Sequence, residues 1–198
     1  MGIPERFLAL GDSFTIGTGT TPDRSFPAVL AAMWRDRGAK VEISNPSVNG
    51  YTSDDLIAEE LPLVAAFHPD LVTVLIGAND IVQGSREDPY RARVARIHKR
   101  IRSNAPAARV IGLPQPDWSL SPAASGFGDP AVIARTIERF NEIAREEAER
   151  AGADWVDLFP LMREQARKGM FASDGLHPSA EAYAQWAGAL SPASVWSP

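Results

Sequence analysis

The sequence contains no cysteine among its 198 residues. This absence excludes disulfide bonds, cysteine-ligated zinc and thiol catalysis. An excess of positive charge is also missing, because 20 lysines and arginines face 25 aspartates and glutamates, for a net charge of -5. Since the phosphates of nucleic acids attract basic surfaces, we expect no nucleic-acid partner.

Long hydrophobic runs are absent as well. The longest strongly apolar stretch covers residues 71–76, far short of the roughly 20 residues that cross a bilayer. Phe7–Leu10 is the apolar run nearest the start of the chain, and it is shorter than the apolar core of a secretion signal, which needs about 7–15 residues. We therefore expect a cytoplasmic protein with no stable membrane insertion, folded as a single domain over residues 1–198.

Short apolar runs alternate with longer helical patterns along the chain. Helices are expected to start near residues that cap or open helices, namely Ser25, Ser53, Asp88, Asp129 and Ser179, with a kink at Pro62 in the second. The runs that predict strands are Phe7–Leu10, Lys40–Ser44, Leu71–Ile76, Arg109–Leu113 and Trp155–Phe159. This order predicts an α/β fold in which about five parallel strands are flanked by helices on both faces. In such sheets ligands bind beyond the carboxyl ends of the strands.

Ser13 stands just after the first predicted strand, in the segment GDSFTIG of residues 11–17. A serine there can present both its hydroxyl and its backbone N–H to a ligand. The alternative is an ordinary turn serine.

Asp174 and His177 lie three residues apart in the segment SDGLHP, just before the last predicted helix. At this spacing the carboxylate can accept a hydrogen bond from one imidazole nitrogen, while the other nitrogen takes a proton from a serine hydroxyl. The alternative is that both residues only shape the turn.

Gly50 and Asn79 follow the second and third predicted strands. Acyl transfer requires hydrogen-bond donors where the oxyanion develops, and the N–H groups of Ser13 and Gly50 with the Asn79 amide would supply three. Taken singly, Gly50 is explained as a turn glycine and Asn79 as a capping asparagine. Because separate loops at one sheet edge supply a nucleophile, a base, an acid and donors together, the combination favours a hydrolase site.

These segments, GDSFTIG, NPSVNG at residues 45–50, GAND at 77–80 and DGLHP at 174–178, resemble the four blocks of the SGNH hydrolases, also called GDSL-type esterases and lipases. The resemblance implies Ser13 as nucleophile, Asp174 and His177 as the rest of a triad, and Ser13, Gly50 and Asn79 as the oxyanion hole. It also implies a flavodoxin-like, three-layer α/β/α sandwich and no cofactor. The first block has phenylalanine where the family name has leucine.

The function expected from these residues is hydrolysis of small carboxylic esters through an acyl-enzyme, with short-chain acyl or acetyl groups. Alternatives within the family are a lysophospholipase or thioesterase and an acyltransferase. A different class, a flavodoxin-like flavin- or nucleotide-binding module, would use the hydroxyl- and glycine-rich segment 13–20 to hold a phosphate. That alternative leaves the GAND and DGLHP segments without a role.

Trp118 lies in the segment 114–128, which has no periodicity and is long for a connection in a compact domain. We expect it to contact substrate, the alternative being a loop tryptophan packed on the body. His68 and His98 have no partners at the spacing of metal ligands, so no metal site is predicted. The basic helix that carries His98 is expected to expose its charged face and to turn Val94 and Ile97 inward.

Overall fold

The computed structural model of the chain describes residues 3–191. Its sheet has five parallel strands in the order β2-β1-β3-β4-β5. They are β1 (Arg6–Gly11), β2 (Glu42–Ser44), β3 (Leu71–Leu75), β4 (Arg109–Gly112) and β5 (Asp154–Trp155). The predicted α/β class and its parallel sheet are confirmed. The domain predicted over residues 1–198 includes residues 1–2 and 192–198, which lie outside the described part.

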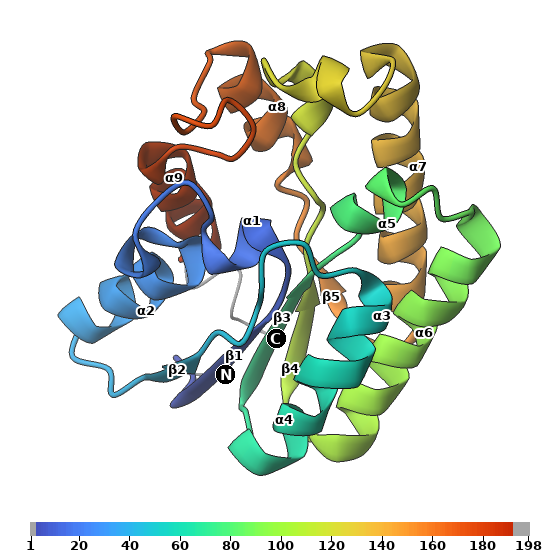
Figure 1. Ribbon diagram of the computed structural model, residues 1–198. Helices are drawn as coiled ribbons and strands as arrows, with labels where there is room; N and C mark the ends of the chain where they lie inside the picture. Colours follow the sequence, from blue (N-terminus) through green and yellow to red (C-terminus); the bar gives the residue numbers. More distant parts are fainter. Residues whose placement is uncertain (1–2, 192–198) are drawn as a thin grey trace.

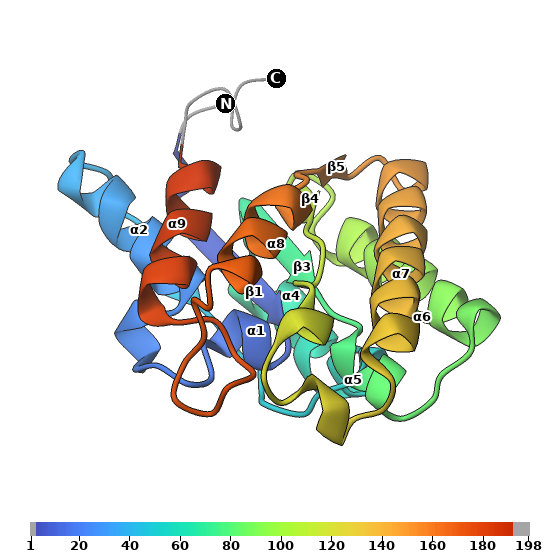
Figure 2. The same ribbon diagram turned by 90° about the horizontal axis from the view of Figure 1, so that it is seen from above.

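Helices cover both faces of this sheet, which gives three layers (Figures 1 and 2). They are α1 (Ser13–Ile16), α2 (Phe26–Asp36), α3 (Ser53–Asp55), α4 (Leu61–Phe67), α5 (Ala78–Val82), α6 (Glu87–Asn104), α7 (Pro130–Arg150), α8 (Phe159–Arg167) and α9 (Ala180–Leu190). Helices α2, α8 and α9 lie on one face, whereas α4 and α6 lie on the other, with α7 beside α6 (Figures 1 and 2). No helix within residues 3–191 is long and apolar enough to cross a membrane.

The strand β1 shows why the sheet has two cores. Its side chains alternate between faces, as in any strand. Phe7 and Ala9 join the apolar cluster that includes residues of α2 and α9, while Leu8 and Leu10 join the cluster under α4 and α6. Because all four are fully buried, this strand must be covered on both sides, as its continuous apolar run indicates.

The carboxyl ends of the strands meet at one edge of the sheet. In register, Leu10 of β1 lies beside Val74 of β3, and Val74 lies beside Gly112 of β4. The segments that leave these strands, including α1 and α5, therefore emerge together at the upper end of the sheet in Figure 1. This is the edge at which the sequence predicts a site.

The strand predicted over Trp155–Phe159 is mostly wrong. The strand β5 covers only Asp154–Trp155, and Phe159 begins the helix α8, which the sequence analysis did not predict. Pro160 stands at the start of this helix, a position that proline favours because its missing N–H has no partner there anyway. The Asp157 carboxylate accepts a hydrogen bond from the Phe159 N–H at 3.0 Å and so fixes the turn into α8.

The helix expected from Ser53 is irregular just before Pro62, where a kink was predicted, but the irregularity is a π-helical turn. Thr52, not Ser53, caps it through reciprocal hydrogen bonds with Asp55. A π-helical turn then covers Leu56–Glu60, and α4 follows. Such wide turns are a recognised cause of helix irregularity, as is proline itself.

The helix α6 is only partly as expected. Val94 and Ile97 point inward, at 1% and 0% exposure, but His98 is also buried, at 3%. Burial lowers the pKa of the His98 imidazole to about 4, because the interior disfavours its charged form. His98 is therefore a neutral core residue and not part of the exposed basic face.

Candidate active site

A cavity of about 260 Å³ opens at the carboxyl edge of the sheet. Its walls come from α1, the segment between β2 and α3, α5, the segment between β4 and α7, and the turn before α9. The lining residues are Ser13, Phe14, Asn49, Ala78, Asn79, Val82, Trp118, Phe127, Leu176 and His177. Four residues singled out from the sequence thus share one cavity: Ser13, Asn79, Trp118 and His177.

Ser13 begins the short helix α1 directly after β1. The Asp12 carboxylate caps this helix by accepting a hydrogen bond from the Phe14 N–H at 3.0 Å. Gly11 must lack a side chain here, since an added Cβ would lie 2.3 Å from both the Leu75 carbonyl oxygen and the Thr15 hydroxyl. This close packing holds the strand-to-helix turn that presents Ser13 to the cavity.

Asp174 and His177 form the pair that their spacing predicts. Asp174 Oδ2 lies 2.7 Å from His177 Nδ1, and Asp174 Oδ1 accepts hydrogen bonds from the N–H groups of Leu176 (2.9 Å) and His177 (3.0 Å). Although partial burial raises the pKa of the Asp174 carboxyl, these hydrogen bonds outweigh it and hold the pKa below its ordinary value. The imidazole is thereby oriented by a carboxylate, with its ring 5.3 Å from the ring of Phe14.

Asn79 connects two of the loops at this edge. Its side-chain nitrogen donates a hydrogen bond to the Tyr51 carbonyl oxygen at 2.9 Å. An amide NH₂ has two donors, so one remains for the cavity that Asn79 lines. Gly50 adopts a left-handed φ of 92°, which favours glycine. Among the described residues around the cavity, Asn49 lines the wall and Gly50 does not, so Gly50 lies beside the cavity, one residue from its wall.

Trp118 is buried, at 3% exposure, yet it lines the cavity. Its indole N–H donates to the Gln115 side-chain oxygen at 3.1 Å. The Gln115 backbone is held in turn by the Asn141 amide of α7, through hydrogen bonds of 2.9 and 3.0 Å. On its other side the indole packs edge-on against Phe127, with ring centroids 5.8 Å apart. Trp118 is thus packed on the body, as the alternative held, and it also lines the cavity, while its contact with substrate stays a prediction.

Two buried carboxyls lie behind Ser13 and were missed by the sequence analysis. Burial raises the pKa of Asp12 to about 7 and that of Glu60 to about 8. Glu60 belongs to the π-helical turn and accepts a hydrogen bond from the Gly11 N–H at 3.0 Å. The sequence signal for it was weak, because two adjacent glutamates in a helical pattern usually indicate a solvated face.

The raised pKa values of Asp12 and Glu60 predict how the free energy of unfolding depends on pH. Each binds its proton more tightly in the folded chain than in the unfolded chain, so the free energy of unfolding should fall as pH rises from about 4.5 towards 8. Glu60→Gln cannot ionise and keeps an oxygen for the Gly11 N–H. We expect it to be more stable than the parent at pH 8.5 by about 4 kcal/mol, since each unit of the raised pKa corresponds to about 1.4 kcal/mol, and similar to it at pH 5.

Denaturant unfolding at the two pH values measures this difference. Glu59→Gln on the same turn is the matched control, since Glu59 is exposed. Parallel pH profiles for the parent and Glu60→Gln would show that Glu60 does not carry the effect.

Comparison with known proteins agrees with this geometry. The model of the GDSL-like Lipase/Acylhydrolase family matches residues 9–185. Esterase TesA of Pseudomonas aeruginosa is 25% identical over 175 residues, which cover 88% of this chain and 80% of that protein. An arylesterase of Vibrio mimicus is 26% identical over 180 residues, covering 90% of this chain and 82% of that protein. A crystal structure of TesA superposes with a TM-score of 0.75 at 26% identity, over 93% of this chain and 95% of that chain.

The family match spans the segments that carry Ser13, Asn79, Asp174 and His177, and the fold is that of the crystallised relative. Both of the sequence relatives reported above are named as esterases. The chain therefore belongs to the GDSL-like lipase and acylhydrolase family and is a serine hydrolase of carboxylic esters.

Proposed function

We propose that this chain is one catalytic domain that hydrolyses short-chain carboxylic esters through an acyl-enzyme on Ser13. The observation that carries the proposal is the Asp174–His177 pair, joined at 2.7 Å, whose imidazole lines the same cavity as Ser13 and Asn79. A carboxylate-oriented imidazole beside a serine at a strand end is what nucleophilic acyl transfer needs.

In the proposed mechanism His177 takes the Ser13 hydroxyl proton as the oxygen attacks the ester carbonyl. The N–H groups of Ser13 and Gly50 and the free donor of Asn79 stabilise the oxyanion. The carbon–oxygen bond to the alcohol then breaks, and His177 gives its proton to the departing alcohol. Water, deprotonated by His177, attacks the acyl-enzyme, and Ser13 recovers its proton as the acid leaves. Asp174 keeps the imidazole in one orientation throughout.

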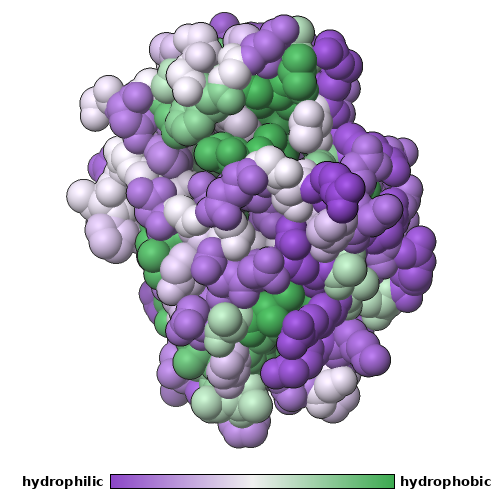
Figure 3. Space-filling model, turned by 45° about the vertical axis from the view of Figure 1, so that its right-hand side comes forward, coloured by the Kyte–Doolittle hydropathy of each residue, from purple (hydrophilic) through white to green (hydrophobic). Residues whose placement is uncertain are grey.

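The size of the cavity supports small acyl groups. At about 260 Å³ it lies below the range of roughly 300–1,000 Å³ that holds drug-sized ligands. Its mouth is apolar, since the lining residues Val82 and Phe127 are 48% and 45% exposed. Two further exposed apolar residues lie nearby in the sequence: Leu120 in the segment 114–128 and Val132 just after it. Figure 3 shows apolar side chains gathered near the top of the view, at the height of this segment. A short alkyl group of a small ester fits such a surface.

The test is a series of p-nitrophenyl esters from acetate to palmitate, together with acetylated sugars. We expect kcat/KM to be highest between acetate and butyrate and to fall steadily with longer chains. Ser13→Ala serves as the control and should lose the activity on every ester. A maximum at palmitate would favour the lysophospholipase or thioesterase alternative, and hydrolysis by Ser13→Ala would contradict the proposal.

A further inference from the structure

A second, smaller cavity lies behind the first, between α8, α9 and the turn that carries His177. It measures about 20 Å³ and is lined mostly by apolar side chains, among them Met162, Met170, Phe171 and Trp186. A cavity of this size has room for about one water-sized group. It is therefore a nearly filled space beside the candidate active site and not an open channel.

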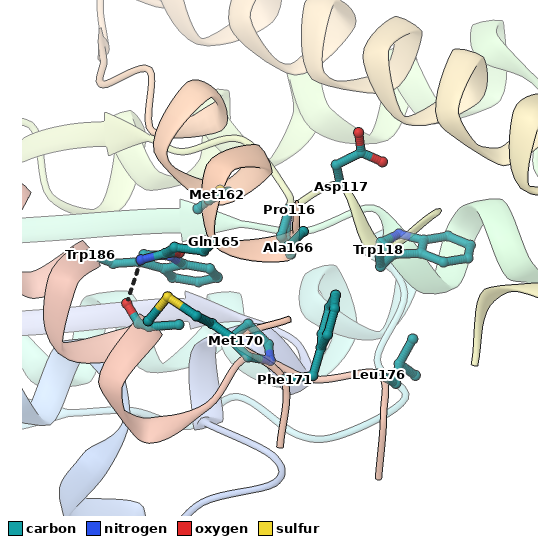
Figure 4. Close-up of a pocket in the computed structure, with 12 residues that line it drawn as sticks. Pro116, Asp117, Trp118, Met162, Gln165, Ala166, Met170, Phe171, Leu176 and Trp186 are labelled. Atoms are coloured by element: carbon teal, nitrogen blue, oxygen red, sulfur yellow. Dashed lines mark hydrogen bonds between the residues drawn. The ribbon is translucent and has the colours of Figure 1, made fainter. Parts of the chain in front are cut away.

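Trp118 and Leu176 are the residues that line both cavities. In Figure 4, Trp118 and Leu176 lie at one end of the residues that line the inner cavity, and Trp186 lies at the other end. Phe171 and Met170 lie between these two ends. Trp118 and Leu176 therefore form the wall between the cavities, which we call the partition.

The partition is held from several directions. The Trp118 indole is fixed by its hydrogen bond to Gln115 and by Phe127 on the side of the active-site cavity. Leu176 is fixed through its backbone, because its N–H donates to the carboxylate of Asp174. Leu176 is thus tied to the carboxylate that orients His177, and Trp118 is tied to the segment between β4 and α7.

The inner cavity suits an alkyl chain and not a polar group. Its one amide side chain among the described lining residues, Gln165, is already bonded: its nitrogen donates to Gln185 (2.8 Å) and its oxygen accepts from the Trp186 indole (2.7 Å). The Asp117 carboxylate at its edge pairs with Arg163 at 3.0 Å. Two of the remaining lining side chains, Met162 and Met170, are methionines, which are unbranched and adapt to fill or vacate irregular space.

From this arrangement we propose that the partition sets the alkyl-chain length that the enzyme accepts, and that the inner cavity is a latent subsite for the alkyl chain of a longer ester. This inference rests on the proposed ester hydrolysis at Ser13. With the partition in place, a chain that grows beyond the outer cavity meets Trp118 and Leu176. Without it, the chain can displace Met170 and enter among Met162, Phe171 and Trp186.

The test compares chain-length profiles after the partition is opened from either side. In Trp118→Ala we expect the kcat/KM of octanoate relative to butyrate to rise about 10-fold or more, because each newly buried methylene contributes about fourfold. In Leu176→Ala the same ratio should rise about fourfold. Trp118 is buried, so Leu176→Ala, a smaller change at a half-buried position, carries the test should the tryptophan variant fail to fold.

Two control variants separate this effect from a general widening of the site. Phe127→Ala removes a ring that touches Trp118 and lines the outer cavity but not the inner one, so the ratio should change less than about threefold. Ala166 lines the inner cavity alone, and adding Ala166→Leu to Trp118→Ala should refill it and bring the ratio back towards the parent value.

Two ester series tell which part of the substrate enters. The p-nitrophenyl series lengthens the acyl chain, and a series of alkyl acetates, followed by proton release, lengthens the alcohol. A shifted profile in either series supports the partition. Unchanged profiles in both series, with Ser13→Ala inactive, would overturn the partition alone, whereas an active Ser13→Ala would overturn the proposed function itself.

Discussion

Replacing His177 by alanine should lower kcat/KM by about 10⁴–10⁶, as far as replacing Ser13 does, and the double variant should lose no more. The reason is that the imidazole and the hydroxyl act as one unit, so that removing either leaves only the oxyanion donors and substrate binding. The lost activity is large because an unassisted serine hydroxyl is a weak nucleophile at neutral pH.

Steady-state kinetics on a p-nitrophenyl acetate substrate measure these losses. A fluorophosphonate reagent gives an independent readout, since Ser13 Oγ bonds to phosphorus and fluoride leaves only when the hydroxyl is activated. We expect labelling of the parent and none of His177→Ala. Ser173→Ala, at an exposed neighbouring position, is the matched control and should label normally. Independent, multiplicative losses in the double variant would show that the two residues do not work together.

The second large effect is expected at Asn79. Asn79→Ala should lower kcat by about 10²–10³, because one hydrogen-bond donor to the oxyanion is lost. Asn79→Asp should be at least as damaging, since a carboxylate cannot donate and repels the developing negative charge.

Asn79 also holds the Tyr51 carbonyl oxygen at 2.9 Å, so a loss of activity has two possible sources. Loss of a donor that acts only in the transition state lowers kcat and leaves KM nearly unchanged, whereas a displaced loop would also raise KM. We expect the first pattern. A kcat within threefold of the parent would remove Asn79 from the proposed oxyanion hole.

Much of the fold could be predicted because its signals are local. The strand β3 is a continuous apolar run, and the helices α7 and α9 begin after Asp129 and Ser179, whose side chains do cap them. The Asp174–His177 contact is local as well, since two residues three positions apart in one turn can meet without help from distant parts of the chain.

The features that escaped prediction depend on packing between distant segments. Glu60 reads as a solvated residue in the sequence, yet the π-helical turn carries it to the Gly11 N–H, 49 positions away. The partition joins Trp118 to Leu176 across a similar gap in the sequence. The start of α8 was missed because the apolar run that contains Phe159 has no period that separates a strand from a helix.

The turn that carries Asp174 and His177 closes on itself. The Ala172 N–H donates to the His177 carbonyl oxygen at 2.7 Å, and the Ser179 N–H donates to the Met170 carbonyl oxygen at 2.9 Å, just before α9 begins. Asp174 and His177 are therefore held in one closed turn, and their alignment should be kept if α9 shifts slightly. The approach of the imidazole to α1, by contrast, depends on tertiary packing, so gradual loosening of the molecule should lower activity there while the Asp174–His177 contact is still intact.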